Sequence, residues 1–194
     1  MNKEILEELL SHVLLNADGA AELLTGEFGS LVGVFEADAD RTSEVLSGDK
    51  QAAVYIKLCC ALASRRGCDR LKPRRKYGED EICEYLKCLF LGLSDETVYL
   101  LSLDNAGKVI ACDRVGEGTV NFSSLLPRRV IDAARKRGAR SVILAHNHPG
   151  GHAKPSGDDE ETTRALSGLF SSSGIELTAH YVVEGDSCAK VTPV

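Results

Sequence analysis

Residues 140–159 read RSVILAHNHPGGHAKPSGDD, and this stretch decides the fold of the C-terminal part of the chain. Residues 140–146 are strongly apolar, which predicts a strand that is buried on both faces of a sheet. The Gly/Pro-rich residues 149–155 predict a loop that ends this strand, and a helix is expected from 156 to about 172. The stretch therefore predicts a strand, a loop and a helix in succession.

The segments on either side of this stretch extend the pattern. They predict strands over 96–104, 108–115, 175–184 and 188–191. They also predict a helix over 127–137, which Pro127 begins. The first two strands are joined by the turn signal Asp104-Asn105-Ala106-Gly107, and Thr119 to Phe122 could add to the sheet. The order β-β-α-β-α-β-β predicts an α/β or α+β domain with helices packed on a mostly mixed sheet.

The first part of the chain has the pattern of helices. Apolar residues at helical spacing, with turn residues between them, predict helices over 3–14, 19–25, 29–36, 40–46, 49–66 and 79–92. We therefore expect three parts: a small all-α domain over 1–68, a basic linker over 69–78 and an α/β domain over 79–194.

The composition is that of a soluble globular protein, with 194 residues, of which 43% are apolar and 27% charged. No apolar run is long enough to span a membrane, and the N-terminus lacks the features of a signal peptide, so we expect a cytoplasmic protein. The net charge of −6 argues against a nucleic-acid-binding surface of bulk positive charge. Residues 65–76 are a local exception with seven basic residues; they could contact phosphate or form a solvated linker, and we favour the linker.

The seven cysteines do not indicate a disulfide framework. Their number is odd, no C-x-x-C pair occurs, and a cytoplasmic chain keeps its thiols reduced. Free thiols in the core are the expected arrangement.

The residues that carry chemistry lie at the end of the 140–146 strand. Side chains two residues apart on a strand point to the same side, so His146 and His148 can face one metal ion. Asp159 falls in the first turn of the following helix and can point back at that ion. Two imidazoles and one carboxylate leave a fourth position open for water, which is typical of a catalytic zinc site.

A hydrolase also needs a group that moves a proton from water to the leaving group. The nearby carboxylates are Glu96, Glu117, Asp158, Glu160 and Glu161, and spacing does not choose among them. A purely structural interpretation exists for Ser156 and Asp159, because S-x-x-D fits a capping box that satisfies free helix N–H groups. The other histidines, His12, His152 and His180, have no such context, although His152 could reach the mouth of the site.

The motif H-N-H-P-G-G-x-x-x-P-S-x-x-D resembles the JAMM metalloprotease motif, in which H-x-H is followed by S-x-x-D. More closely it resembles the RadC family, as do the segments E-T-V-Y-L-L-S-L-D, E-G-T-V-N and L-P-R-R-V-I-D-A-A. This resemblance covers residues 79–194. It implies a JAB/MPN domain of cytidine-deaminase-like α-β-α architecture.

The resemblance also implies roles for particular residues. It implies one zinc ion per chain, held by His146, His148 and Asp159, with Glu96 as the general acid/base and Ser156 as a hydrogen-bond donor to the oxyanion. The implied activity is zinc-dependent hydrolysis of peptide or isopeptide bonds in a protein or peptide substrate. Gly150 replaces a serine of the family, which we do not expect to affect metal binding.

The N-terminal part resembles a degenerate copy of the RadC helix-hairpin-helix region. The segment F-G-S-L-V is similar, but residues 46–52 read LSGDKQA where the family has G-I-G-x-x-K-A. Asp49 adds negative charge beside a turn whose N–H groups would contact a DNA backbone. A second hypothesis is therefore a DNA-associated accessory protein of DNA repair or mobile-element processes, with partner docking as another role for this region.

Other zinc enzymes fit the sequence less well. Zinc deaminases require H-x-E with P-C-x-x-C, and zincins require H-E-x-x-H on a helix; neither pattern occurs. The H-x-H-x-D-H pattern of metallo-β-lactamase-like enzymes is also missing.

Overall fold

The computed structural model describes residues 2–68, 75–117 and 126–192. By its contacts the chain divides into two compact units, Met1–Gly67 with Leu91–Ser94, and Cys68–Phe90 with Asp95–Val194. Residues 91–94 thus group with the helical unit, whereas the sequence pattern predicted them as part of the second domain. Most of the expected linker, 69–74, lies outside the described residues. No helix within the described ranges is long and apolar enough to cross a membrane.

The first unit is made of helices of 6 to 19 residues. These are α1 (Asn2–Ser11), α2 (Ala17–Phe28), α3 (Leu31–Glu36), α4 (Ala39–Val45) and α5 (Lys50–Cys68). Polar side chains begin three of them: Asn16, Ser30 and Asp38 each accept an N–H from the first turn of α2, α3 and α4. The helices enclose a core that includes the fully buried Leu6, Leu10, Leu24, Val34 and Ile56.

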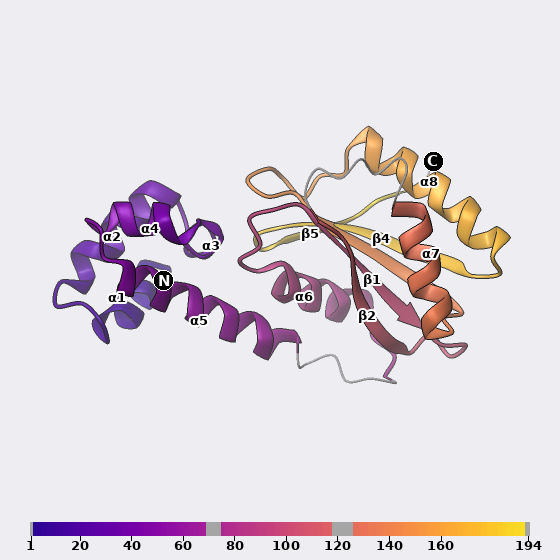
Figure 1. Ribbon diagram of the computed structural model, residues 1–194, viewed down its shortest axis with the longest axis horizontal. Coiled ribbons are helices and arrows are strands. Elements are labelled where there is room, and N and C mark those ends of the chain that lie inside the picture. Colours follow the sequence, from indigo (N-terminus) through magenta and orange to yellow (C-terminus); the bar gives the residue numbers. More distant parts are fainter. Residues whose placement is uncertain (1, 69–74, 118–125, 193–194) are drawn as a thin grey trace. The chain divides into compact units, whose positions relative to one another are not determined.

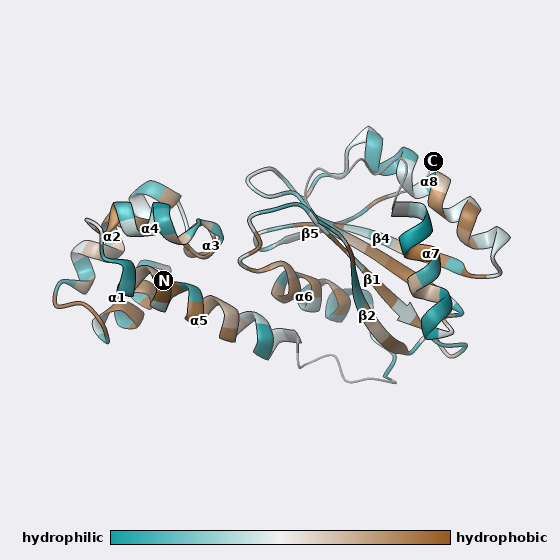
Figure 2. Ribbon diagram, viewed as in Figure 1, coloured by the Kyte–Doolittle hydropathy of each residue, from teal (hydrophilic) through white to brown (hydrophobic). Residues whose placement is uncertain are grey.

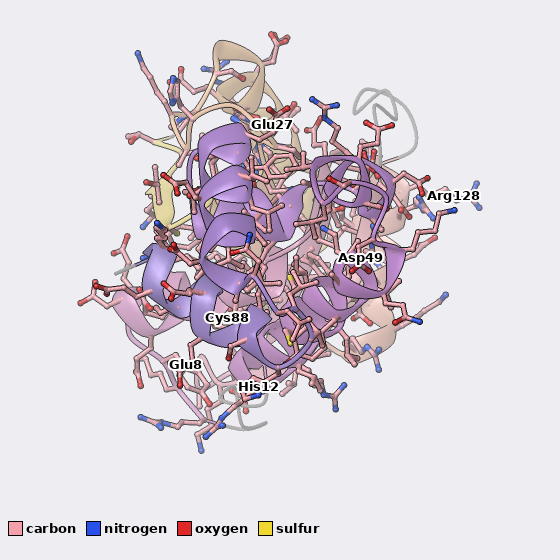
Figure 3. The ribbon with its side chains drawn as sticks, turned by 90° about the vertical axis from the view of Figure 1, so that its left-hand side faces the viewer. Glu8, His12, Glu27, Asp49, Cys88 and Arg128 are labelled. Carbon is pink, nitrogen blue, oxygen red and sulfur yellow. The ribbon has the colours of Figure 1, made fainter. Side chains whose placement is uncertain are left out.

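The turn between α4 and α5 has a strained backbone and a side-chain cap. Ser47 and Gly48 adopt φ values of 56° and 90°, the left-handed region that a non-glycine residue rarely occupies. Asp49, labelled in Figure 3, follows them and accepts the N–H of Ala52 through Oδ1 at 2.9 Å. The carboxylate of Asp49 therefore caps the N-terminus of α5.

The second unit is a mixed α/β domain. Its elements are α6 (Glu79–Phe90), β1 (Thr97–Leu103), β2 (Val109–Glu117), α7 (Leu126–Arg137), β3 (Ser141–Asn147), α8 (Gly157–Ser172), β4 (Glu176–Glu184) and β5 (Ser187–Lys190). The strand order is β2-β1-β3-β4-β5. Only β3 and β4 pair in parallel, while the other pairs are antiparallel. The predicted fold class and mixed sheet are confirmed. The possible extra strand at 119–122 lies outside the described ranges.

Helices cover both faces of this sheet, as Figure 1 shows, with α7 and α8 on one face and α6 on the other. In Figure 2, α7 has both hydrophobic and hydrophilic bands, as expected for a helix with one face on a core. On the α7/α8 side, Leu100, Leu144 and Phe170 are fully buried in one cluster. On the other side, the rings of Phe90 and Tyr99 meet edge to face at 5.4 Å. The strand that carries the two histidines is therefore held between two packed layers.

The cysteines are free, as expected, within the part of the chain that the structure describes. Their burial differs from the expectation. Cys60 alone is fully buried among those described, and the others are partly exposed.

Candidate metal centre

The end of β3 places two imidazoles beside each other. His146 is fully buried and pairs with Val98 of β1 on one side and Val182 of β4 on the other. His148 continues the strand, because its N–H donates to the carbonyl of Val183 at 3.0 Å. The two side chains lie on the same side, and their Nε2 atoms are 2.9 Å apart.

A tight turn follows these histidines. Pro149 and Gly150 occupy its central positions, Gly150 has φ of 68°, and the N–H of Gly151 donates to the carbonyl of His148 at 3.0 Å. The turn brings the carbonyl of His152 to 3.1 Å from Nδ1 of His148. A carbonyl only accepts hydrogen bonds, so Nδ1 of His148 carries the hydrogen. Nε2 is therefore the nitrogen of His148 that a metal ion can bind. The contact of His152 is made by its backbone carbonyl, whereas the sequence indicated only that this residue could reach the mouth of the site.

The first turn of α8 supplies the carboxylate. Ser156 and Asp159 form a capping box, in which Ser156 Oγ accepts the N–H of Asp159 at 3.1 Å and the Ser156 N–H donates to Asp159 Oδ2 at 2.7 Å. The Ser156 hydroxyl donates to the same Oδ2 at 2.6 Å. The predicted cap is thus confirmed, and it leaves Oδ1 facing His146. Partial burial would raise the pKa of Asp159, but hydrogen bonds from His146 and Ser156 hold it well below its usual range.

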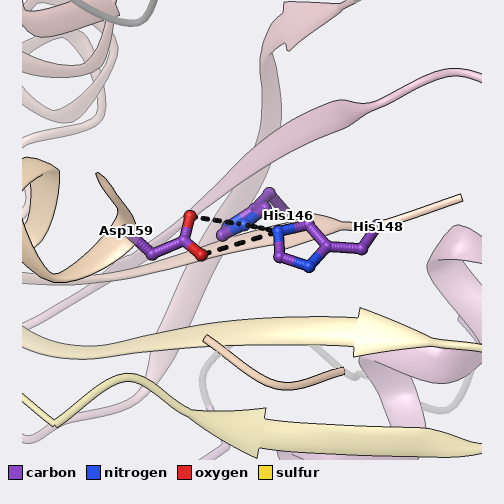
Figure 4. A group of neighbouring side chains, drawn as sticks. All are labelled: His146, His148 and Asp159. Carbon is purple, nitrogen blue, oxygen red and sulfur yellow. Dashed lines mark hydrogen bonds and ion pairs between the residues drawn. The ribbon is translucent and has the colours of Figure 1, made fainter. Parts of the chain in front are cut away.

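The three side chains meet at a spacing that suits a metal ion (Figure 4). His146 Nε2 lies 3.0 Å from Asp159 Oδ1, and His148 Nε2 lies 3.6 Å from Asp159 Oδ2. A tetrahedral ion with bonds of about 2.0–2.2 Å separates its ligand atoms by about 3.3–3.6 Å, so the observed distances fit with small adjustments. Within the described ranges this is the one group of three or more such residues with its ligand atoms this close, and it could hold a metal ion.

Behind His146 lies a buried hydrogen-bonded chain that the sequence pattern did not predict. His146 Nδ1 is 2.8 Å from His180 Nε2, and His180 Nδ1 is 2.6 Å from Thr163 Oγ1. Thr163 Oγ1 in turn donates to the carbonyl of Asp159 at 2.6 Å. His180 and Thr163 are almost completely buried, and burial, with the adjacent His146, lowers the pKa of His180 to about 3. Thr163 lies four residues, or one helical turn, after Asp159, and this spacing in the sequence could have placed its side chain near the site.

A second residue that the sequence analysis missed lies between the two histidines. The buried Asn147 accepts the N–H of Thr97 through Oδ1 at 2.7 Å and donates through Nδ2 to the carbonyl of Asp95 at 3.3 Å. Its side chain thus holds the backbone on both sides of Glu96. Glu96 is partly exposed and precedes by two residues Val98, the partner of His146 in the sheet.

The other carboxylates that we considered are also placed by the structure. Glu117 forms an ion pair with Arg114 at 2.9 Å, at the end of β2. Asp158, Glu160 and Glu161 lie in the first turns of α8. Neither these residues nor Glu96 belongs to the group of three.

Comparisons with known proteins agree with this architecture. The family model described as the RadC-like JAB domain matches residues 77–191. A UPF0758 protein of Herminiimonas arsenicoxydans is 32% identical over 163 residues, which are 84% of this chain and 73% of the relative. A UPF0758 protein of Photobacterium profundum is 33% identical over 174 residues, which are 87% of this chain and 76% of the relative. With a matching domain model and relatives of this similarity over most of its length, the chain belongs to the RadC-like JAB domain family.

Proposed function

We propose that this protein is a zinc-dependent hydrolase of peptide or isopeptide bonds, with one ion held by His146, His148 and Asp159. The observation that supports it most is the convergence of two imidazole nitrogens and the two oxygens of one carboxylate at 2.9–3.6 Å. Two nitrogens and one oxygen suit zinc better than magnesium or calcium, which prefer oxygen ligands throughout. When bound, such an ion acts as a Lewis acid and lowers the pKa of a coordinated water to near 7.

The exposure of the three side chains indicates where a substrate would approach. His146 is fully buried, Asp159 is 12% exposed and His148 is 25% exposed. The site is therefore closed on the side of the sheet and open on the side of His148. Three protein ligands with one open side are typical of a catalytic rather than a structural site.

Glu96 is the proposed general acid/base. The hydrogen bonds of Asn147 to Asp95 and Thr97 hold the backbone around Glu96 just before the first residue of β1, the strand that pairs with β3. Its carboxylate would accept a proton from the nucleophilic water and deliver it to the leaving amine. This assignment, like the choice of an amide bond, is supported by the resemblance to JAMM metalloproteases.

Ser156 is the proposed oxyanion donor. Its hydroxyl hydrogen points to Asp159 Oδ2, so this role requires the hydroxyl to turn toward the substrate. Asp159 Oδ2 would keep the hydrogen bond from the Ser156 N–H, and the carboxylate would stay in place.

Metal analysis tests the proposal directly. We expect about one zinc per chain in protein purified without a metal-binding tag, and loss of the metal in His148→Ala and Asp159→Ala. A screen against peptide and isopeptide substrates follows, with Glu96→Gln as the variant that keeps zinc but loses turnover. If the wild type binds no zinc even after reconstitution, the proposal is wrong.

A DNA-associated role is the second candidate. The observation that favours it is that α4 and α5 are joined by a left-handed turn at Ser47 and Gly48, where the resemblance implies a helix-hairpin-helix. Asp49 argues against it, because its carboxylate adds negative charge and already accepts an N–H at the start of α5 that a DNA phosphate would need. Asp49→Ser would keep a capping side chain and remove the charge, so DNA binding by this turn should strengthen in that variant. If neither protein binds branched or single-stranded DNA at low salt, this candidate is excluded.

A further inference from the structure

We propose that Thr163 and His180 are positioning residues that hold a hydrogen on Nδ1 of His146, so that Nε2 is the ring nitrogen that binds a metal. This role of Thr163 and His180 rests on the proposed metal site, but the positions of the histidine hydrogens can be measured in metal-free protein. The proposal follows from the direction of three consecutive hydrogen bonds.

The direction is set at Thr163. Its Oγ1 lies 2.6 Å from the backbone carbonyl of Asp159. Two oxygen atoms approach this closely only with a hydrogen between them, and a carbonyl has none, so the hydroxyl of Thr163 must donate. A hydroxyl has one hydrogen. Toward every other neighbour, Thr163 Oγ1 can therefore only accept.

The next bond fixes the hydrogen of His180. Its Nδ1 lies 2.6 Å from Thr163 Oγ1, which has only lone pairs left to offer, so Nδ1 of His180 must carry a hydrogen. His180 is 1% exposed, and a buried imidazole without a carboxylate partner at either nitrogen stays neutral. A neutral imidazole has a single N–H, so Nε2 of His180 is an acceptor.

The last bond fixes the hydrogen of His146. Its Nδ1 lies 2.8 Å from the accepting Nε2 of His180, so Nδ1 of His146 donates. Nε2 is then the ring nitrogen of His146 that a metal ion can bind, and it faces Asp159 Oδ1 at 3.0 Å and His148 Nε2 at 2.9 Å. The opposite tautomer would place an N–H where a metal ion needs a ligand atom.

The two histidine ligands are thus prepared in the same way from different parts of the fold. The carbonyl of His152 orients His148 through a local turn, and His180 orients His146 from β4, 34 residues later in the chain. Both Nε2 atoms and the Asp159 carboxylate point at one place. Such an arrangement attracts a cation, and outer partners of this kind commonly change metal affinity about 10- to 100-fold when removed.

Nuclear magnetic resonance of ¹⁵N-histidine-labelled full-length protein tests the inference. The chain has five histidines, so single His→Gln variants assign the long-range ¹H–¹⁵N spectrum. In chelator-treated wild type we expect the hydrogen of His180 on Nδ1, and a hydrogen on Nδ1 of His146. A hydrogen on Nε2 of His180, or none on Nδ1 of His146, would overturn the proposal even if zinc binds well.

Three variants of α8 separate positioning from packing. Thr163→Val removes the hydroxyl with little change of shape, and it should move the hydrogen of His180 to Nε2 and weaken zinc binding about tenfold or more in a chelator competition. Thr163→Ser keeps a hydroxyl and should retain both tautomers and an affinity close to that of wild type. Thr162→Val makes the same change at a partly exposed neighbour and serves as the matched control.

The outcomes distinguish the two proposals. Unchanged tautomers and zinc affinity in Thr163→Val would refute the positioning role while leaving the hydrolase proposal intact. Wild-type protein with the expected tautomers but without zinc binding would refute the hydrolase proposal and leave the hydrogen-bonded chain established.

Discussion

Replacing Asn147 with alanine should lower stability and impair turnover while leaving the metal ligands in place. The side chain of Asn147 is 4% exposed and makes two hydrogen bonds to the backbone around Glu96, at 2.7 and 3.3 Å. Its removal leaves the buried N–H of Thr97 without the acceptor Oδ1. The penalty for an unsatisfied buried donor is about 1–3 kcal/mol, and the longer bond adds little.

Thermal unfolding measures this cost. For a chain of this length, 1 kcal/mol shifts Tm by roughly 2–4 °C, so Asn147→Ala should unfold roughly 2–12 °C below wild type. Asn105→Ala, at an exposed turn position, is the matched control and should unfold close to wild type. A change below about 2 °C for Asn147→Ala would show that the side chain does not hold this segment.

Zinc content and kinetics separate stability from function. Asn147 adjoins both ligands in sequence, but its hydrogen bonds go to Asp95 and Thr97, away from the ligand group. Zinc affinity should therefore stay within about threefold of wild type. If Glu96 is the general acid/base, kcat should fall at least tenfold, because a misplaced base loses much of its effect. Loss of zinc together with activity would instead show that Asn147 supports the histidines.

Three further outcomes follow from the structure. Ser156→Ala removes the capping hydroxyl of α8 and one hydrogen bond to Asp159. It should therefore lower the free energy of unfolding, measured by thermal unfolding, by about 1 kcal/mol and weaken zinc binding. Ser156→Thr keeps a hydroxyl, so both its stability and its zinc affinity should fall less. Removal of zinc by chelation should lower Tm reversibly, because an ion at 100 times its Kd stabilises by about 2.7 kcal/mol; His148→Ala should show no such shift. Gly92→Ala should lower the free energy of unfolding of the helical unit by about 2 kcal/mol or more, as measured by thermal unfolding. The reason is that φ of Gly92 is 80° and the new Cβ would lie 2.5 Å from Cys60 Sγ. Gly26→Ala, at an exposed position with open space, is the control and should not lower stability.

The sequence predicted the parts of the site that are local. The apolar run of β3, the turn after His148 and the cap of α8 are each encoded within a few residues, and all three form in the structure. Strand alternation brought His146 and His148 together, because their relation depends on spacing alone. The cap and the ligand role of Asp159 could not be separated in the sequence, and in the structure one carboxylate has a position that suits both.

The parts that the sequence did not reveal depend on contacts between distant segments. His180 had no local context, and its importance emerges only when β4 pairs with β3 and its ring reaches His146. Asn147 looked like a spacer between two histidines until β1 lay beside it, 50 residues from its partner Thr97. The short segment 91–94 likewise groups with the helical unit through packing that its sequence does not signal.

The capping box at Ser156 also has a consequence for how fast a bound ion could leave. Asp159 is held by the first turn of a helix, whereas His146 is held in the middle of a sheet. Helix ends fray at far lower free energy than central strands open. Release of the carboxylate would therefore need only a brief local opening of that turn, so the exchange rate of the ion should follow amide hydrogen exchange at Asp159 rather than global unfolding.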